Sequence, residues 1–217
     1  MIDFGKLRAA MIDSQLRTND VHDPRLLAAV AATPRERFVP AARRSVAYMS
    51  EAIEIGQGRW LMDPRSFGKL FQLADIVETD VALIIGCGSG YSAAVASKLA
   101  STVVALEENA ELYSQASQAT SELGLDNAAV VSGKLVSGFP KQGPYDVIIF
   151  DGAVEDVPDA IVSQLKDGGR LAVILRKGPL GKGQLFVKSR AGVSRRVAFD
   201  ATVPLLPGFQ QVPGFVF

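Results

Sequence analysis

The chain has 217 residues, of which 48% are hydrophobic and 21% charged, ordinary values for a globular protein with one core. Lysine plus arginine and aspartate plus glutamate both number 23, so no net charge favours nucleic acid or a membrane surface as partner. No uncharged stretch approaches the roughly 18 residues of a membrane span, and the start MIDFGKLRAA lacks the apolar core of a signal peptide. We expect a cytoplasmic protein of one domain, with its oligomeric state left open.

The only cysteine, Cys87, excludes an internal disulfide and argues against a cysteine-built metal site. A single thiol agrees with a reducing compartment. We therefore expect no bound metal, and we interpret Cys87 as a small loop residue without a redox role.

The first 67 residues predict a helical extension and a connector. Residues 4–17 carry apolar side chains at roughly helical spacing, and Asp23-Pro24 opens a second helix that reaches Val30. The segments TPRERFVP and AARRSVAY follow. Residues 51–64 contain glycine, proline and few periodic apolar positions, so they predict either an ordered connector that faces a ligand or a plain surface crossing.

From Gly68 the pattern alternates helices with strands, which is typical of a doubly wound α/β sheet. Unbroken apolar runs such as VALII and DVIIF predict parallel strands buried on both faces. A helix is expected over PDAIVSQLK, ending at Asp167-Gly168-Gly169. Beyond residue 176, QLFVKSR and SRRVAFDATVPL predict antiparallel strands at one edge, before a short apolar tail. We predict a Rossmann-like core over residues 68–217, within a single domain spanning residues 1–217.

The segment IIGCGSGYSAA places Gly86, Gly88 and Gly90 between a predicted buried strand and a predicted helix. Glycine permits positive φ angles and leaves no Cβ to block a ligand. The helix N-terminus adds amide donors that favour a carboxylate or phosphate. The G-x-G-x-G spacing differs from the G-x-G-x-x-G of dinucleotide-binding proteins. In this setting the triplet predicts a cofactor site.

Glu107 follows Gly86 by 21 residues and ends the predicted strand TVVAL. A carboxylate at that point can accept both ribose hydroxyl protons of a bound nucleoside. The alternative is a solvated acid at the start of a helix, because Glu108 and Asn109 come next.

Several segments occur in a characteristic order: MIDSQLR, DPRLLAAV, TPRERFVP with AARRSVAY, the loop IGCGSGY, LKDGGRLAV, and VPL at 203–205. Over nearly its whole length the chain resembles the protein-L-isoaspartate O-methyltransferases. Members bind S-adenosyl-L-methionine and methylate the stray α-carboxylate of isoaspartyl residues in damaged proteins. The resemblance implies a Rossmann-like methyltransferase fold, that cofactor, and a protein or peptide substrate. It also implies cofactor-binding roles for Gly86, Gly88, Gly90 and Glu107.

The segment GQGRWLMDP at residues 56–64 departs from the family's G-H-G-Q-T-x-S-x-P stretch. Trp60 stands at the threonine position and Met62 at the serine thought to act in transfer. A thioether cannot donate a hydrogen bond, so Met62 cannot do the serine's work. By the resemblance, Gly58, Trp60 and Met62 belong to the substrate cleft. Trp60 either contacts a ligand there or packs as an anchor of the connector.

Two positions near the cofactor also differ from the family. Ile84 stands where the strand before the glycine loop usually supplies an acid, and Lys134 replaces the aspartate that usually meets the adenine amine. An ammonium cannot accept a hydrogen bond from that amine. A lost charged hydrogen bond costs about 1.5–3 kcal/mol. Without compensation, the two changes together predict weakened cofactor binding.

Asp151 ends the predicted strand DVIIF, where the family has a small or hydroxyl residue. Ligands of open α/β sheets bind at that edge. Asp151 is therefore a candidate general base for a hydroxyl substrate or a ligand of a hard cation. The alternative is a cap for the following helix.

Three functions remain compatible with these residues. The first is carboxyl methylation of isoaspartyl protein, in which positioning and desolvation can supply most of the catalysis, because a carboxylate is already a nucleophile. The second keeps the cofactor but uses a different acceptor, with Asp151 and Trp60 forming another pocket. The third is a binding module that retains the fold without catalysis.

Overall fold

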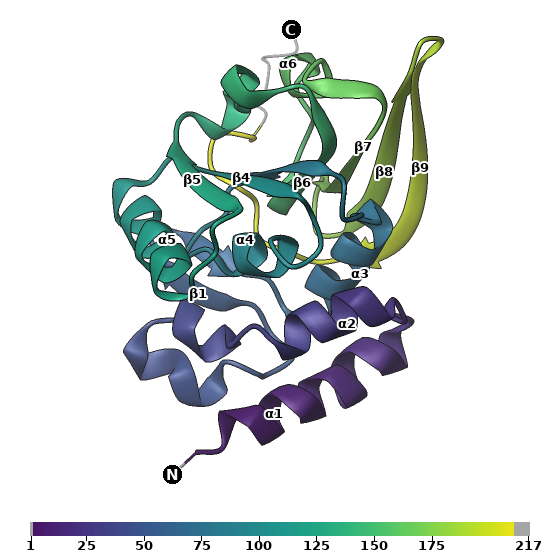
Figure 1. Cartoon of the computed structure of the whole chain (residues 1–217). Helices are drawn as coiled ribbons and strands as arrows, with labels where there is room; N and C mark the ends of the chain where they lie inside the picture. The colour runs from purple at the N-terminus through teal and green to yellow at the C-terminus, as the bar shows by residue number, and fades with distance from the viewer. Residues whose placement is uncertain (1, 211–217) are drawn as a thin grey trace, which may run out of the picture.

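A seven-stranded sheet forms the centre of the computed structural model, which describes residues 2–210 (Figure 1). Its strands are β3 (Val81–Ile85), β4 (Thr102–Glu107), β5 (Ala128–Ser132), β6 (Tyr145–Val154), β7 (Leu165–Arg176), β8 (Gly181–Ser189) and β9 (Gly192–Ala201). The apolar tail noted in the sequence lies, from residue 211 onward, outside the described residues.

The strand order is β5-β4-β3-β6-β7-β8-β9. All neighbours from β5 to β7 pair in parallel, whereas β8 and β9 add in antiparallel fashion. The chain progresses toward one edge from β3 to β5 and toward the other from β6 onward. The direction therefore switches between β3 and β6, and ligands of such sheets bind outside the carboxyl ends of the strands at that point. The predicted doubly wound sheet with an antiparallel edge is confirmed.

Alternate residues of each central strand enter two separate cores. In β3, for example, Ala82 and Ile84 join one cluster while Leu83 and Ile85 join the other. This period of two follows from strand geometry. The first cluster lies between the sheet and the helices α3 (Pro64–Ala74), α4 (Tyr91–Ala96) and α5 (Ala110–Glu122), with the N-terminal helices packed outside them, below the sheet in Figure 1. The second is covered by α6 (Asp159–Val162), above the sheet. Because helices cover both faces of the sheet, its central strands consist of almost continuous runs of hydrophobic residues.

Four of the α-helices among residues 2–210 begin at an Asp or Asn side chain that accepts a hydrogen bond from an amide of the first turn. Asp63 accepts a hydrogen bond from the amide of Ser66 at 2.9 Å, and Asn109 accepts from two amides at the start of the next long helix. Such side chains satisfy amides that have no partner inside the helix. None of the helices among residues 2–210 is long and apolar enough to cross a membrane. The α-helices are α1 (Phe4–Met11), α2 (Pro24–Ala31), α3 (Pro64–Ala74), α4 (Tyr91–Ala96), α5 (Ala110–Glu122) and α6 (Asp159–Val162).

The predicted N-terminal helix continues past α1 as one turn of π-helix and one of 3₁₀-helix, through residues 12–19. The TPRERFVP and AARRSVAY segments form 3₁₀-helices, η3 (Arg35–Phe38) and η4 (Ala41–Val46). Further 3₁₀ turns are η5 (Leu135–Ser137) and η6 (Pro140–Gln142).

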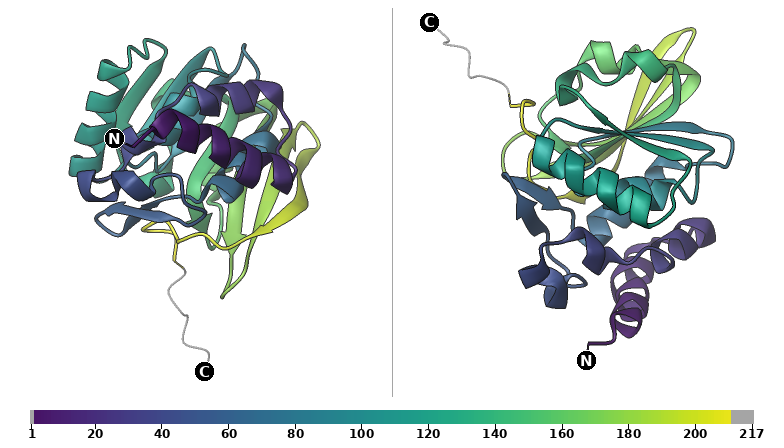
Figure 2. Two further views of the ribbon diagram at one scale, coloured as in Figure 1. Left: turned by 90° about the horizontal axis from the view of Figure 1, so that it is seen from below. Right: turned by 60° about the vertical axis from the view of Figure 1, so that its left-hand side comes forward.

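The connector is a β-hairpin rather than a plain surface crossing. Its strands β1 (Ile53–Gly56) and β2 (Arg59–Leu61) form a separate two-stranded sheet. Gln57 and Gly58, between the strands, both have positive φ, of 55° and 67°. That combination is the one a two-residue type I′ turn requires. Figure 2 shows the hairpin beside the chain's yellow C-terminal segment in both views, and both line one cavity.

The helix expected over residues 158–166 is wrong in extent. α6 ends at Val162, and strand β7 already begins at Leu165, so Gly168 lies within the strand at a φ of 80° instead of capping a helix. The carbonyl of Gln164 accepts a hydrogen bond from the Tyr145 amide at 2.8 Å. Sheet pairing at the start of β6 and β7 therefore overrides the local helical pattern.

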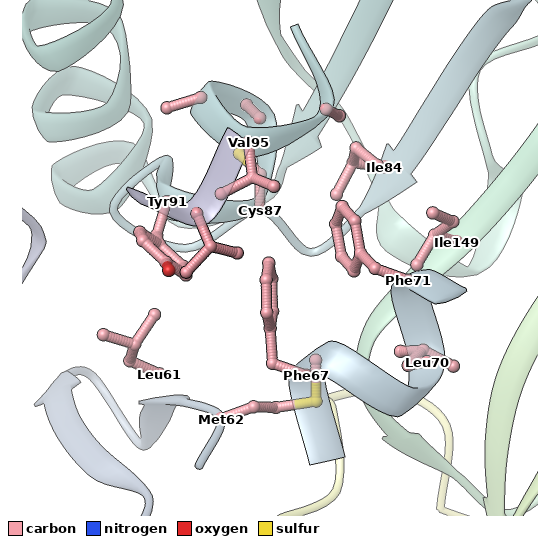
Figure 3. Packing of buried hydrophobic residues seen from close by; sticks show 14 of the residues in the cluster. Leu61, Met62, Phe67, Leu70, Phe71, Ile84, Cys87, Tyr91, Val95 and Ile149 are labelled. Atoms are coloured by element: carbon pink, nitrogen blue, oxygen red, sulfur yellow. The ribbon is translucent and has the colours of Figure 1, made fainter. Parts of the chain in front are cut away.

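Ile84 is a core residue. Its side chain is fully buried, and Figure 3 shows it beside Phe71 and Ile149. Members of the family were expected to carry an acidic residue at this position. In this chain the residue is apolar, and its neighbours are aromatic and aliphatic. A charge at this site would be buried without a partner.

Replacing Ile84 by aspartate should lower the free energy of unfolding by about 4 kcal/mol or more, because the carboxylate has no partner in the core. Ile84→Val, which removes one methylene, should cost only about 0.5–1.5 kcal/mol. Urea denaturation followed by circular dichroism measures both. Equal, small losses for the two variants would contradict the placement of Ile84.

Candidate functional site

The glycine loop and Glu107 lie together at the carboxyl edge of β3 and β4. Gly86, Gly88 and Gly90 have φ values of 77°, 56° and 100°, a region that residues with a Cβ rarely adopt. Glu107 ends β4 with its side chain fully buried, and its Oε2 accepts a hydrogen bond from the Gly88 amide at 2.8 Å. The alternative of a solvated Glu107 at a helix start is wrong.

Neighbouring elements fix the loop in place. The hydroxyl of Ser89 donates to the carbonyl of Phe38 at 2.6 Å, which joins the loop to the RERF turn. A Cβ on Gly90 would approach the backbone of Ala116 in α5 to 3.2 Å, so a larger residue would push α4 and α5 apart. The TPRERFVP segment therefore helps to hold the glycine loop in position, through the backbone carbonyl of Phe38.

The hairpin delivers a guanidinium to Glu107. Nη1 of Arg59 donates to both carboxylate oxygens of Glu107, at 2.7 and 2.8 Å, and Nη2 donates to the carbonyl of Gly86 at 2.6 Å. The two side chains are only 4% and 0% exposed. Charge-assisted hydrogen bonds of this length are the strong ones.

The acceptor capacity of Glu107 is filled within the chain. Besides Arg59 and the amide of Gly88, the amides of Glu108 and Asn109 donate to Oε1 at 3.0 and 3.1 Å. An ionised carboxylate offers about four lone-pair sites. No site is left for a pair of ribose hydroxyls in this arrangement.

The open faces of the glycines are also covered. A Cβ built on Gly86 would lie 2.9 Å from Nη2 of Arg59 and 2.9 Å from a methyl of Leu206. One on Gly88 would lie 2.7 Å from Cδ1 of Ile55. The surface that a nucleoside would approach is therefore filled by the hairpin and the C-terminal segment. In this closed arrangement the residues do not fit S-adenosyl-L-methionine.

The residues expected in the substrate cleft have different environments. Gly58 lies in the exposed hairpin turn, Trp60 is 38% exposed on β2, and Met62 is buried. Figure 3 shows Met62 beside Phe67, so its thioether is part of the core. All three nevertheless line one cavity of about 10 Å³, together with Asp151. That volume is near the minimum for a single water molecule.

Asp151 reaches this cavity from β6. It is 6% exposed, and its Oδ1 has no hydrogen-bond partner in the structure. Burial raises its pKa to about 6, although Ser92 and the nearby charge of Arg59 act in the opposite direction. Asp151 does not cap α6, whose N-cap is Pro158. Within residues 2–210 no group of three or more His, Cys, Asp or Glu side chains could hold a metal ion.

Lys134 lies between β5 and the η5 turn, as the N-cap residue of that turn, and its side chain is exposed. The preceding residue, Gly133, donates its amide to the backbone carbonyl of Glu107 at 3.2 Å. Lys134 therefore follows a strand next to β4 without entering the buried cluster. Cys87 lies inside the loop, and burial raises the pKa of its thiol well above the ordinary value, which keeps it protonated.

Two arginines were missed in the sequence. Arg59 is the only basic residue of the connector, residues 51–64, and it follows closely on Gly56 and Gly58. This isolated charge could have marked Arg59 as a candidate functional residue. Arg35 gave no comparable signal. Its buried guanidinium donates to the carbonyls of Ala47 and Met62 at 2.7 and 2.6 Å and lies over the Tyr91 ring, so it fixes the segment that leads out of the hairpin.

The family model for protein-L-isoaspartate(D-aspartate) O-methyltransferase matches residues 7–203. The chain belongs to this family. A protein-L-isoaspartate O-methyltransferase of Koribacter versatilis is 36% identical over 209 residues, covering 94% of this chain and 92% of the relative. Another, from an Anaeromyxobacter species, is 36% identical over 180 residues, covering 83% and 73%.

Solved structures of the family share the fold. One protein-L-isoaspartate O-methyltransferase superposes with a TM-score of 0.80 at 24% identity, over 95% of this chain and 66% of that one. The beta-aspartate methyltransferase of Plasmodium falciparum, in complex with S-adenosyl-L-homocysteine, gives a TM-score of 0.78 at 15% identity, over 95% and 99%. At these identities the structures bear on the methyltransferase fold alone.

Asp151 should make stability depend on pH. Its pKa of about 6 in the folded chain exceeds the ordinary 3.8, so between these values the folded state holds a proton that the unfolded state has lost. The favourable contribution is complete below about pH 4 and disappears as pH rises through 6. Asp151→Asn lacks this titration. The difference in unfolding free energy, variant minus wild type, should therefore grow by up to about 3 kcal/mol from about pH 4 to pH 7. A pH-independent difference in urea denaturation would contradict the environment described for Asp151.

Proposed function

We propose that this protein is an S-adenosyl-L-methionine-dependent methyltransferase that acts on isoaspartyl carboxylates of proteins or peptides. The family match over residues 7–203 carries the proposal. The glycine loop at the carboxyl edge of β3 and the carboxylate of Glu107 at the end of β4 support it, because they form the framework of a nucleoside site.

The chain's own residues limit what the catalytic contribution can be. Met62 has no hydroxyl to donate, and its side chain is buried in the core. The carboxylate of an isoaspartyl residue is already nucleophilic, so orientation and exclusion of water can supply most of the rate. The hairpin is the element placed to orient an acceptor, since Gly58 and Trp60 lie on it beside the cavity. That role also requires the closed cleft to open.

A second candidate is methylation of a different acceptor. It is favoured by the unpartnered Oδ1 of Asp151, which lies at the cavity shared with Trp60. An ionised Asp151 would repel a second carboxylate, whereas it would accept a hydrogen bond from a hydroxyl or ammonium group. In this alternative Asp151 acts as the general base and the acceptor is not an isoaspartyl residue.

Incubation with labelled S-adenosyl-L-methionine and an isoaspartyl peptide should yield a base-labile methyl ester, whereas the matched aspartyl peptide should give none. The loss of the serine predicts slow turnover, because no hydroxyl assists the transfer. Absence of product with a broad panel of isoaspartyl peptides, from protein that binds the cofactor, would contradict the acceptor assignment.

The same assay with Asp151→Asn separates the two acceptors. Carboxylate methylation should persist or increase in the variant, because removing the negative charge lessens repulsion. Methylation of a hydroxyl or amine acceptor should fall by about 10²–10⁴-fold if Asp151 is its base. Loss of isoaspartyl methylation in Asp151→Asn would count against the first candidate.

A further inference from the structure

Arg59 occupies the positions that a nucleoside needs. It binds both oxygens of Glu107 and the carbonyl of Gly86, and it lies against the bare face of Gly86. We propose that Arg59 is an internal competitor of the cofactor, and that the β1–β2 hairpin must withdraw it before S-adenosyl-L-methionine can bind. This inference rests on the proposed function.

The competition follows from the acceptor count at Glu107. Each carboxylate oxygen already accepts from Arg59 and from backbone amides, at distances between 2.7 and 3.1 Å. The amides belong to the loop and to the start of the next helix, so they cannot leave without local unfolding. The guanidinium is the one removable donor in this set. Ribose hydroxyls can therefore reach Glu107 only by replacing Arg59.

The hairpin can move without breaking the main sheet. β1 and β2 pair only with each other, and no backbone hydrogen bond joins residues 53–61 to the central sheet among the described residues. The hairpin is held by side chains: Arg59 on Glu107, Ile55 over Gly88, Gln57 on Glu111 at 2.8 Å, and Ile53 and Leu61 buried in the first core cluster. Withdrawal of the hairpin would uncover Gly88 and Glu107 and would remove Arg59 from Gly86, which then keeps Leu206 of the C-terminal segment as its neighbour.

The closed state should limit the apparent affinity for the cofactor. When only a fraction of the molecules has Arg59 withdrawn, the apparent dissociation constant equals the intrinsic constant divided by that fraction. The hairpin also carries Trp60 and Gly58, which face the cavity near Asp151. A polypeptide acceptor that engages the open hairpin would therefore promote cofactor binding, and the cofactor would promote acceptor binding by the same factor.

Titration calorimetry with S-adenosyl-L-homocysteine tests the proposal on the full chain. Arg59→Gln keeps a polar side chain but removes the charge and the fork of donors, so it should bind at least tenfold more tightly than wild type. Arg65→Gln is the matched control, because Arg65 is an exposed arginine of the adjacent helix without a contact to Glu107. It should bind like wild type.

The outcomes separate the inference from the function on which it rests. Tighter binding by Arg59→Gln alone supports the competition. Binding by wild type that is unchanged or weakened in Arg59→Gln overturns the competition and leaves the proposed function in place. No binding to wild type or to Arg59→Gln at millimolar ligand overturns both.

Wild-type kinetics provide a second measurement in case Arg59→Gln does not fold. Trp60 is the only tryptophan of the chain and adjoins Arg59 in β2, so its fluorescence reports on the hairpin. After rapid mixing with S-adenosyl-L-homocysteine, the rate of the fluorescence change should level off as ligand increases, because opening precedes binding. A rate that rises linearly at about 10⁵–10⁷ M⁻¹s⁻¹, without a plateau, would overturn the proposal.

Discussion

The buried pair of Arg59 and Glu107 joins the three elements that define the site: the hairpin, the glycine loop and the end of β4. Removing two ions from water is costly, and their attraction compensates only when the remaining hydrogen-bonding groups are also satisfied. Here the carbonyl of Gly86 accepts a hydrogen bond from the second terminal nitrogen of the guanidinium. Three backbone amides donate to the remaining acceptor sites of the Glu107 carboxylate. The loop conformation, the position of the hairpin and the covered cleft therefore depend on one another.

A member of this methyltransferase family can have a closed cleft, because the chain's own side chains can occupy the groups that would bind a nucleoside. The groups that form a nucleoside site, a carboxylate with bare glycine faces beside it, also form a good site for a guanidinium and an isobutyl group. Arg59 and Leu206 use them as such. A ligand then binds in exchange for the chain's own side chains, so affinity depends on the difference between two sets of contacts rather than on the ligand's contacts alone. Gly58 and Trp60, the hairpin residues that line the cavity near Asp151, would move together with Arg59.

Local patterns in the sequence were sufficient for the sheet, the glycine loop and the place of Glu107, because strand burial and glycine's positive φ are determined within a few residues. They failed where distant segments decide. The contact of Arg59 with Glu107 spans 48 residues, and no periodicity encodes it. The same holds for the end of α6, where pairing of Tyr145 with Leu165 replaces the expected helix. The roles predicted for Trp60, Met62 and Asp151 depend on a cleft that the closed hairpin covers, so they stay predictions.

A crystal structure of the protein with S-adenosyl-L-homocysteine would test most directly whether the cofactor replaces Arg59 at Glu107. We expect that the ribose hydroxyls bind Glu107, that the guanidinium of Arg59 has left both Glu107 and Gly86, and that the hairpin has moved away from the loop. A ligand bound at the glycine loop while the Arg59 contacts to Glu107 remain at 2.7 and 2.8 Å would contradict this expectation.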